Sequence, residues 1–242
     1  VNLETQGGAF GTRQMSGNLT GQSESLDYFL SVADFDTDGF NNRVSDVSAD
    51  EDGYENHTFH GRFGYVLSEA WRFDLVHREV DGSNDYDGCF GPSGPSGDCR
   101  SDYDMQASRL GLQFHGEGFS HQLSYMRSST DRQDFTASAP TFGSQGEQTR
   151  GEYIGSLTAL EGVDLIWGLD YQEDVANGVG RDNQGAFVEL LSDFSQAYFF
   201  TAGLRYDDNE DFGSNTSFRL STAYLVETKA GTLKFKAALG SG

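Results

Sequence analysis

Apolar and polar residues alternate with a period of two along almost the whole chain, and this pattern restricts the fold more than any other feature. Residues 59–67 read FHGRFGYVL and residues 109–115 read RLGLQFH. Such alternation predicts β-strands with two chemically different faces. No segment keeps a helical stripe and no run of about 18 apolar residues is present, so a membrane-spanning helix is excluded.

About twelve strands are predicted, and their connections alternate between short turns and long loops. The predicted strands cover residues 9–22, 26–35, 56–67, 70–80, 102–115, 119–130, 149–160, 163–174, 184–193, 197–207, 216–227 and 231–242. The long loops are predicted at 36–55, 81–101, 131–148, 175–183 and 208–215. Because consecutive strands run antiparallel, every long loop leaves the same end of the sheet. Strands of about ten residues with this asymmetry are typical of outer-membrane β-barrels.

The environment decides where the apolar residues point. In lipid every backbone N–H and C=O must pair internally, so a closed barrel turns its apolar residues outward and its polar residues toward the lumen. In a soluble β-sandwich, which is the alternative fold, the same apolar residues would form a core. Aromatic residues near strand ends, where membrane interfaces place them, favour the barrel: Tyr28, Tyr65, Trp71, Tyr198 and Tyr224. We therefore predict an all-β, transmembrane, antiparallel up-and-down β-barrel.

The charge balance excludes several classes of protein. Sixteen Lys and Arg residues oppose 38 Asp and Glu residues, which gives a net charge of −22. A nucleic-acid partner is excluded because such proteins need a basic face to neutralise phosphates. An acidic disordered chain is also a poor match, since those chains contain few aromatic residues and this one has 19 Phe and 11 Tyr.

Most of the acidic excess lies in the long loops, and two of them carry the largest numbers of acidic residues. The first carries Asp36, Asp38, Asp46, Asp50, Glu51, Asp52 and Glu55, and the second carries Asp81, Asp85, Asp87 and Asp98. A solvated, mutually repelling surface is the simpler interpretation. Many carboxylates in neighbouring loops are costly to hold together without cations, and calcium takes six to eight oxygen ligands from flexible loops. Residues 34–39 match the opening of an EF-hand loop, but Ser45 stands where the twelfth position requires Glu, so we reject that motif.

The chain has two cysteines, Cys89 and Cys99, which flank a Gly- and Pro-rich stretch of one long loop. This arrangement predicts a disulfide formed in an oxidising compartment such as the periplasm. Closing so short a loop contributes about 2–3 kcal/mol. Zinc is the weaker alternative, because no CxxC motif or second Cys or His pair has ligand spacing.

Several segments in order along the chain resemble TonB-dependent outer-membrane receptors, and among them the cobalamin (vitamin B12) receptors. They are residues 8–12 (GAFGT), 49–54 (ADEDGY), 57–61 (HTFHG), 68–71 (SEAW), 203–213 (GLRYDDNEDFG) and 233–242 (LKFKAALGSG). The resemblance implies that residues 1–242 are a partial barrel domain, about the first half of a barrel of about 22 strands, without the plug and the C-terminal strands. It also implies a multi-pass protein in the outer membrane of a Gram-negative bacterium, with lipid and lipopolysaccharide around it and TonB engaged through the plug.

Carried over by position, the resemblance implies calcium ligands at Asp50, Asp52, Tyr86, Asp87 and Asp98. In the family, calcium orders these loops so that they grip the corrinoid ligand. A further family ligand falls on Asn41, with Asp38 or Asp46 nearby, which leaves the number of ions open. The cysteine pair is not part of the family pattern and is expected to supply some of the same ordering.

The expected function is transport of a scarce, bulky ligand, most simply cobalamin, and not catalysis. A ferric-siderophore or haem receptor is the alternative within the family, although acidic loops disfavour an anionic chelate. A passive porin or adhesin would need neither plug nor calcium. A twelve-stranded outer-membrane phospholipase would need a nucleophilic Ser beside a His on the lipid-facing side. No Ser-containing motif pairs in sequence with any of the five histidines: His57, His60, His77, His115 and His121.

Overall fold

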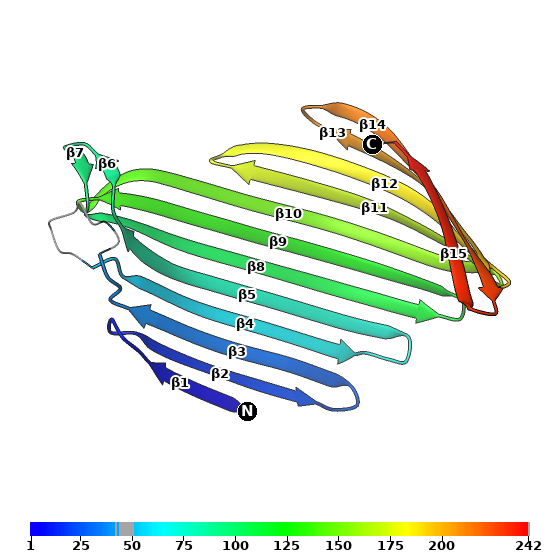
Figure 1. Ribbon diagram of the computed structural model, residues 1–242, viewed down its shortest axis with the longest axis horizontal. Helices are drawn as coiled ribbons and strands as arrows, with labels where there is room; N and C mark the ends of the chain where they lie inside the picture. The colour runs from blue at the N-terminus through cyan, green and yellow to red at the C-terminus, as the bar shows by residue number, and fades with distance from the viewer. Residues whose placement is uncertain (42, 44–50, 242) are drawn as a thin grey trace.

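In the computed structural model, which describes residues 1–41, 43 and 51–241, thirteen strands form one antiparallel sheet in chain order (Figure 1). Each strand pairs with the next: β1 (Asn2–Gly7), β2 (Arg13–Gln22), β3 (Leu26–Thr37), β4 (Tyr54–Val66), β5 (Trp71–Tyr86), β8 (Cys99–Gly116), β9 (Phe119–Thr136), β10 (Ala139–Leu160), β11 (Val163–Ala176), β12 (Val179–Phe194), β13 (Tyr198–Asn209), β14 (Gly213–Thr228) and β15 (Gly231–Gly240). A separate hairpin of β6 (Cys89–Gly91) and β7 (Gly94–Ser96) lies between β5 and β8. The predicted all-β, antiparallel, up-and-down topology is confirmed.

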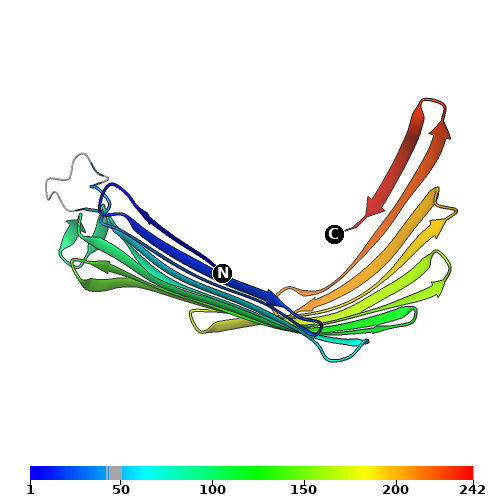
Figure 2. The same ribbon diagram turned by 90° about the horizontal axis from the view of Figure 1, so that it is seen from below.

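The sheet is strongly curved and open, with β1 and β15 at its two edges (Figure 2). Within the described part of the chain, no helix has the length and apolar character needed to cross a membrane.

The strand register separates an apolar face from a polar face. Residues that are direct cross-strand partners point to the same side of a sheet. One row of partners that crosses six neighbouring strands is entirely apolar or aromatic: Tyr65, Phe73, Leu112, Leu123, Tyr153 and Leu169. Their neighbours one residue away along each strand form the polar face. The period of two in the sequence therefore becomes two continuous surfaces.

The apolar face does not pack against another layer. Among the residues that the structure describes, only Val80 and Cys99 are buried hydrophobic residues. Leu123 and Leu169 on the apolar face keep 56% and 58% of their surface exposed. The only other described sheet is the short β6–β7 hairpin, so the soluble β-sandwich alternative is wrong for this chain. An apolar surface of this extent marks contact with a membrane or a partner.

Three of the predicted long loops are wrong. β9 and β10 continue through residues 131–148 and meet at a tight turn in which Ala137 and Ser138 have φ values of 48° and 65°. The other two predicted loops, 175–183 and 208–215, are likewise strand extensions, joined by tight turns at residues 177–178 and 210–212. In these segments the regular apolar alternation ends but the backbone pairing continues, so the change in composition marks the end of the apolar band and not the end of the sheet.

β1 is an additional strand that the sequence pattern did not predict, since Asn2–Gly7 lacks regular alternation. It pairs antiparallel with β2, from Asn2 opposite Asn18 to Gly7 opposite Arg13. The sheet therefore holds thirteen strands where about twelve were expected.

On the polar face, the side chain of an arginine on β5 extends over a glycine on β4 and reaches an aspartate on β3. Asp27, Gly64 and Asp74 are direct cross-strand partners. Arg72 Nη2 donates to Asp27 Oδ2 at 2.7 Å, and Arg72 Nε donates to Asp74 Oδ1 at 3.0 Å. A Cβ on Gly64 would lie 2.0 Å from Arg72 Nη2, so only glycine allows the guanidinium to cross. We call this arrangement the first arginine brace.

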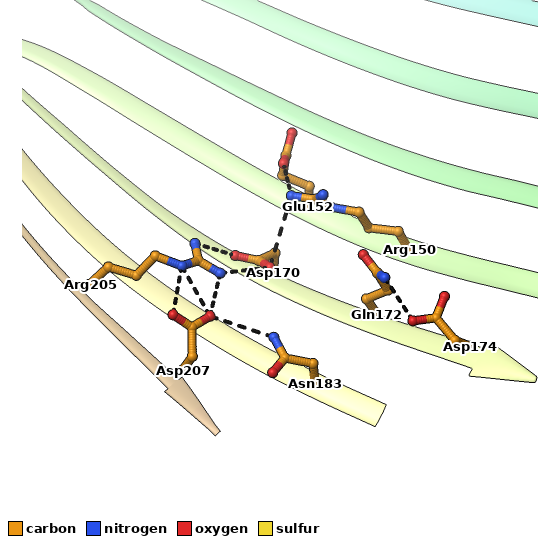
Figure 3. A network of polar contacts seen from close by, with 8 residues as sticks. All are labelled: Arg150, Glu152, Asp170, Gln172, Asp174, Asn183, Arg205 and Asp207. Carbon is orange, nitrogen blue, oxygen red and sulfur yellow. Dashed lines mark hydrogen bonds and ion pairs between the residues drawn. The ribbon is translucent and has the colours of Figure 1, made fainter. Parts of the chain in front are cut away.

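The same arrangement recurs on β11, β12 and β13 as the second arginine brace (Figure 3). Asp170, Gly185 and Asp207 are direct partners, and Arg205 precedes Asp207 by two residues as Arg72 precedes Asp74. Arg205 Nη1 donates to Asp170 Oδ2 at 2.9 Å, and Arg205 Nη2 donates to Asp207 Oδ1 at 2.6 Å. A Cβ on Gly185 would lie 2.2 Å from Arg205 Nη2. Each brace ties three strands together through side chains as well as backbone.

Replacing Gly64 or Gly185, the glycines over which the guanidinium groups extend, should destabilise the sheet. We expect Gly64→Ala and Gly185→Ala each to lower the free energy of unfolding by about 1–3 kcal/mol, because the added methyl displaces a guanidinium from its carboxylate. Urea unfolding of the protein in lipid vesicles, followed by tryptophan fluorescence, measures the change. Gly146→Ala is the matched control, since Gly146 lies on the same face and a Cβ added there would meet no atom within 4 Å. Equal effects in all three variants would contradict the brace.

Candidate functional site

A cavity of about 530 Å³ lies at the end of the sheet that carries the long connections. Figure 1 shows the β6–β7 hairpin at this end. Its walls come from the segment before β4, the end of β5, the start of β8 and the β9–β10 turn. The lining residues are Glu51, Asp52, Asp85, Gly97, Asp98, Cys99, Arg100, Asp102, Phe135 and Ser138. We call it the acidic cavity, because five carboxylates face one guanidinium.

The segments around the acidic cavity are fixed by backbone contacts. The Asp85 amide donates to the Gly53 carbonyl at 2.8 Å, which joins the segment before β4 to the end of β5. Gly39 has a φ of 73°, and a Cβ there would lie 1.9 Å from the Asp52 carbonyl oxygen. Both the left-handed conformation and this close approach require glycine. The described parts of the connection between β3 and β4 therefore pack against each other.

The electrostatics of the acidic cavity centre on Asp85. Burial is the largest effect and raises the pKa of the Asp85 carboxyl; Arg100, its direct cross-strand partner, opposes this shift. The carboxylates of Asp52, Glu55 and Asp102 raise the pKa of Asp85 further. Arg100 Nε also donates to Asp102 Oδ1 at 2.6 Å, so its single positive charge is shared between two carboxylates. The cavity retains an excess of negative charge that suits a cation.

The predicted disulfide between Cys89 and Cys99 is confirmed, with a Cα–Cα distance of 5.9 Å. Cys99 is buried, and the Cys89 amide lies 3.1 Å from its sulfur. Thr136 Oγ1 donates to Cys89 Sγ at 3.1 Å, and the Ala137 amide donates to the Asp98 carbonyl at 2.9 Å. The disulfide therefore holds one wall of the acidic cavity, and the β9–β10 turn supports it.

The structure brings together only part of the predicted calcium set. Asp52 and Asp98 line the same cavity. Tyr86 ends β5 opposite Cys99 and Asp87 follows it, and neither lines the cavity. Asp50 lies outside the described residues. Within residues 1–41, 43 and 51–241, no three acidic, Cys or His residues form a group that could hold a metal ion. Calcium binding stays a prediction.

Asp85, Arg100 and Asp102 line the cavity but were missed as site residues by the sequence reasoning. Asp85 was recognised only as one of many loop acids. The missing information was the register, which places Asp85 opposite Arg100 once the β6–β7 hairpin is recognised. The structure agrees with the rejection of the EF-hand motif, because Asp34 and Asp36 lie inside β3 and not in a loop.

One histidine does pair with a serine, which the sequence did not indicate. His77 Nδ1 lies 2.8 Å from Ser108 Oγ on the side of the sheet that carries the apolar face, and His77 Nε2 lies 3.9 Å from Glu79 Oε2. Hydrolysis also needs donors for the oxyanion that forms. Ser108 lies within a continuous ladder between β5 and β9, so the backbone amides around it are committed to strand pairing. The pair lacks the remaining machinery of a hydrolase.

No family model matches the chain. It is 24% identical over 98% of its length to a vitamin B12 transporter of Photobacterium profundum, of which it covers 39%. It is 25% identical over 94% of its length to a vitamin B12 transporter of Vibrio vulnificus, of which it covers 37%. The chain thus spans well under half the length of these relatives.

Solved structures share the fold. The siderophore receptor PirA of Pseudomonas aeruginosa matches 95% of the chain with a TM-score of 0.71 at 18% identity, and the chain covers 39% of it. A mutant ferric enterobactin receptor of the same organism, bound to enterobactin, matches 94% with a TM-score of 0.72 at 15% identity, and the chain covers 41% of it. The resemblance to the barrel of TonB-dependent receptors is confirmed. At these identities the solved structures establish the barrel fold alone.

Removing the disulfide should loosen the cavity wall and leave the sheet intact. We expect the Cys89→Ser/Cys99→Ser variant to lose about 2–3 kcal/mol of local stability in residues 86–100, because the loop is no longer closed covalently. Amide hydrogen exchange measures this, and Ala137, whose amide donates to Asp98, is a reporter outside the loop.

A reductant provides the control for this prediction. It should reproduce the faster exchange in the wild type and change nothing in the double variant. Unchanged exchange at residues 86–100 in the double variant would contradict a stabilising role for the disulfide.

Proposed function

We propose that this chain forms part of the barrel wall of an outer-membrane, TonB-dependent transporter that captures cobalamin on calcium-ordered acidic loops. The observation that carries the proposal is the collinear match of 98% of the chain to a vitamin B12 transporter. The proposal includes a Gram-negative outer membrane, contact with lipid and lipopolysaccharide, and coupling to TonB through a plug domain.

The apolar face supports a membrane location. Two adjacent rows of cross-strand partners, one through Tyr65 and Phe73 and the other through Phe63 and Leu75, present large apolar side chains to one side of the sheet. Hydrocarbon is the solvent that makes such a surface favourable, and strand pairing satisfies the backbone polar groups that lipid cannot.

The acidic cavity supports calcium as the ordering ion. Its charged lining is rich in carboxylate oxygen, which hard cations prefer, and it lacks the thiolate or imidazole donors that would favour zinc. Asp52 and Asp98 would hold the ion from two walls, and Asp50, Tyr86 and Asp87 would complete the predicted set. Bound calcium would neutralise the carboxylates and tie the segment before β4 to the disulfide-bonded hairpin.

Charge argues against a siderophore receptor, and backbone pairing argues against a hydrolase. A ferric siderophore is commonly anionic, and five carboxylates at the capture end would repel it. A hydrolytic function would rest on the His77–Ser108 pair, whose surrounding backbone amides are all engaged in the sheet. Transport of a bulky ligand that is not strongly anionic fits the site better than either.

Calcium-dependent cobalamin binding tests the proposal. We expect calorimetry on the intact protein to show cobalamin binding that calcium strengthens and a chelator weakens. Asp52→Asn and Asp98→Asn should each weaken calcium binding about tenfold or more, equivalent to about 1.4 kcal/mol, because each removes an anionic ligand. No cobalamin binding with or without calcium would refute the proposal.

A charge-matched control separates specific ligands from general acidity. Asp211 is exposed in the β13–β14 turn and lies outside the acidic cavity, so Asp211→Asn should leave the calcium affinity within a factor of two. If Asp211→Asn lowered the calcium affinity as much as Asp52→Asn does, calcium binding would depend only on the net charge of the loops and not on specific ligands.

A further inference from the structure

A second hollow lies on the polar face, at the short-turn end and therefore at the opposite end of the strands from the acidic cavity. It has a volume of about 980 Å³ and surrounds the first arginine brace. Its charged lining consists of Arg62, Arg72, Arg109, Asp27 and Asp74. Three guanidinium groups thus face two carboxylates, in a chain whose net charge is −22.

The two braces differ in how their surroundings balance charge. In the second brace, Arg150 Nη2 donates to Glu152 Oε2 at 2.8 Å, and Glu152 adds a third carboxylate beside Asp170 and Asp207 (Figure 3). Two guanidinium groups there face three carboxylates. Glu152 is the partner of Asp170 on the preceding strand, whereas in the first brace the partner of Asp27 on the preceding strand is Gln22, so no acidic side chain occupies the corresponding place. The same structural device is therefore left with an excess of positive charge.

Two of the three arginines in this hollow are held less firmly than Arg72. Arg62 Nη2 donates one hydrogen bond of 3.4 Å to Asp27 Oδ1, and the Arg62 side chain is 57% exposed. Arg109 makes no ion pair with any residue in the described part of the chain. Val76 lies between them as the direct partner of both, so the two guanidinium groups stand on either side of a small apolar floor. Their strands are two spacings, about 10 Å, apart.

His60 adds an unsatisfied donor or acceptor to the same lining. Its Nδ1 atom is buried and has no hydrogen-bond partner within the described residues, and its ring packs 5.9 Å from that of Phe29. A buried polar atom without a partner costs free energy that a bound ligand recovers. Guanidinium groups are the preferred protein partners of carboxylate and phosphate because they offer paired donors.

From this geometry we propose that the polar face between β3 and β8 binds an oxyanion group, a carboxylate or phosphate, held by Arg62 and Arg109 over Val76 with His60 beside them. Arg72 contributes charge but stays in the brace with Asp27 and Asp74. The site is separate from the acidic cavity and requires neither calcium nor cobalamin. It lies where the short turns end the sheet, on the opposite face from the Asp85 and Arg100 side chains of the acidic cavity.

Direct titration of the intact protein in detergent tests this site, with inorganic phosphate and citrate as the two probes in calcium-free buffer of low ionic strength. We expect saturable binding of at least one probe with a Kd of about 1 mM or tighter. Arg62→Gln and Arg109→Gln should each weaken it fivefold or more. His60→Phe, which keeps a ring against Phe29, should weaken it by a smaller factor.

Arg219→Gln is the matched control, because Arg219 lies on the same face on β14, away from this hollow, and loses the same charge. Arg219→Gln should leave the Kd for the probe within a factor of two. Asp52→Asn should also leave this Kd within a factor of two, so the test of the oxyanion site is independent of the test of the calcium proposal. The absence of saturable binding would overturn the inference. An equal loss in Arg219→Gln would also overturn it, by showing that only diffuse charge attracts the probe.

Discussion

Backbone pairing between neighbouring strands is the constraint on which the rest of this structure depends. Each strand of the sheet pairs with the next over most of its length, from β1 to β15. In hydrocarbon an unpaired N–H or C=O costs several kcal/mol, because no water can replace the missing partner. Within the described sheet, the exposed backbone of β1 and β15 lies at the two edges, and in a membrane each edge requires a pairing partner, which a further strand, another chain or closure of the sheet on itself would supply. The larger barrel that the resemblance implies is one way to meet this requirement.

Once the register is set, each residue has a fixed face, and the chemistry of the chain divides accordingly. The side chains of the apolar face remain exposed and pack against no second layer, so the described residues contain almost no buried hydrophobic core. The polar face is stabilised by side-chain networks, and the two arginine braces are the clearest examples. In each brace the glycine of the middle strand leaves room for the guanidinium to cross. Stability is therefore distributed along the wall and not concentrated in one centre.

The sequence predicted every strand of the large sheet except β1, together with their order and two faces, because a period of two is a local property that can be recognised without knowledge of the pairing partners. It did not predict where strands end beyond the apolar band, since polar residues such as those around Ala137 pair as well as apolar ones. The disulfide was predictable because only two cysteines exist. The acidic cavity and the braces were not, because Asp85 meets Arg100, and Arg72 meets Asp27, only through the register. Contacts between strands are set by pairing, which one sequence does not reveal.

The net charge of the chain is a poor guide to either of its charged sites. Arg72 and Asp85 lie at opposite ends of β5, 13 residues apart, which is about 43 Å at the rise of an extended strand. The Debye length at physiological salt is about 8 Å, so the carboxylates at one end are screened from the guanidinium groups at the other. A strongly acidic protein can therefore hold a cation at its capture end and an anion near its short turns, each governed by its own neighbours. The strand length that spans a membrane also separates the two sites enough for opposite charges to act independently.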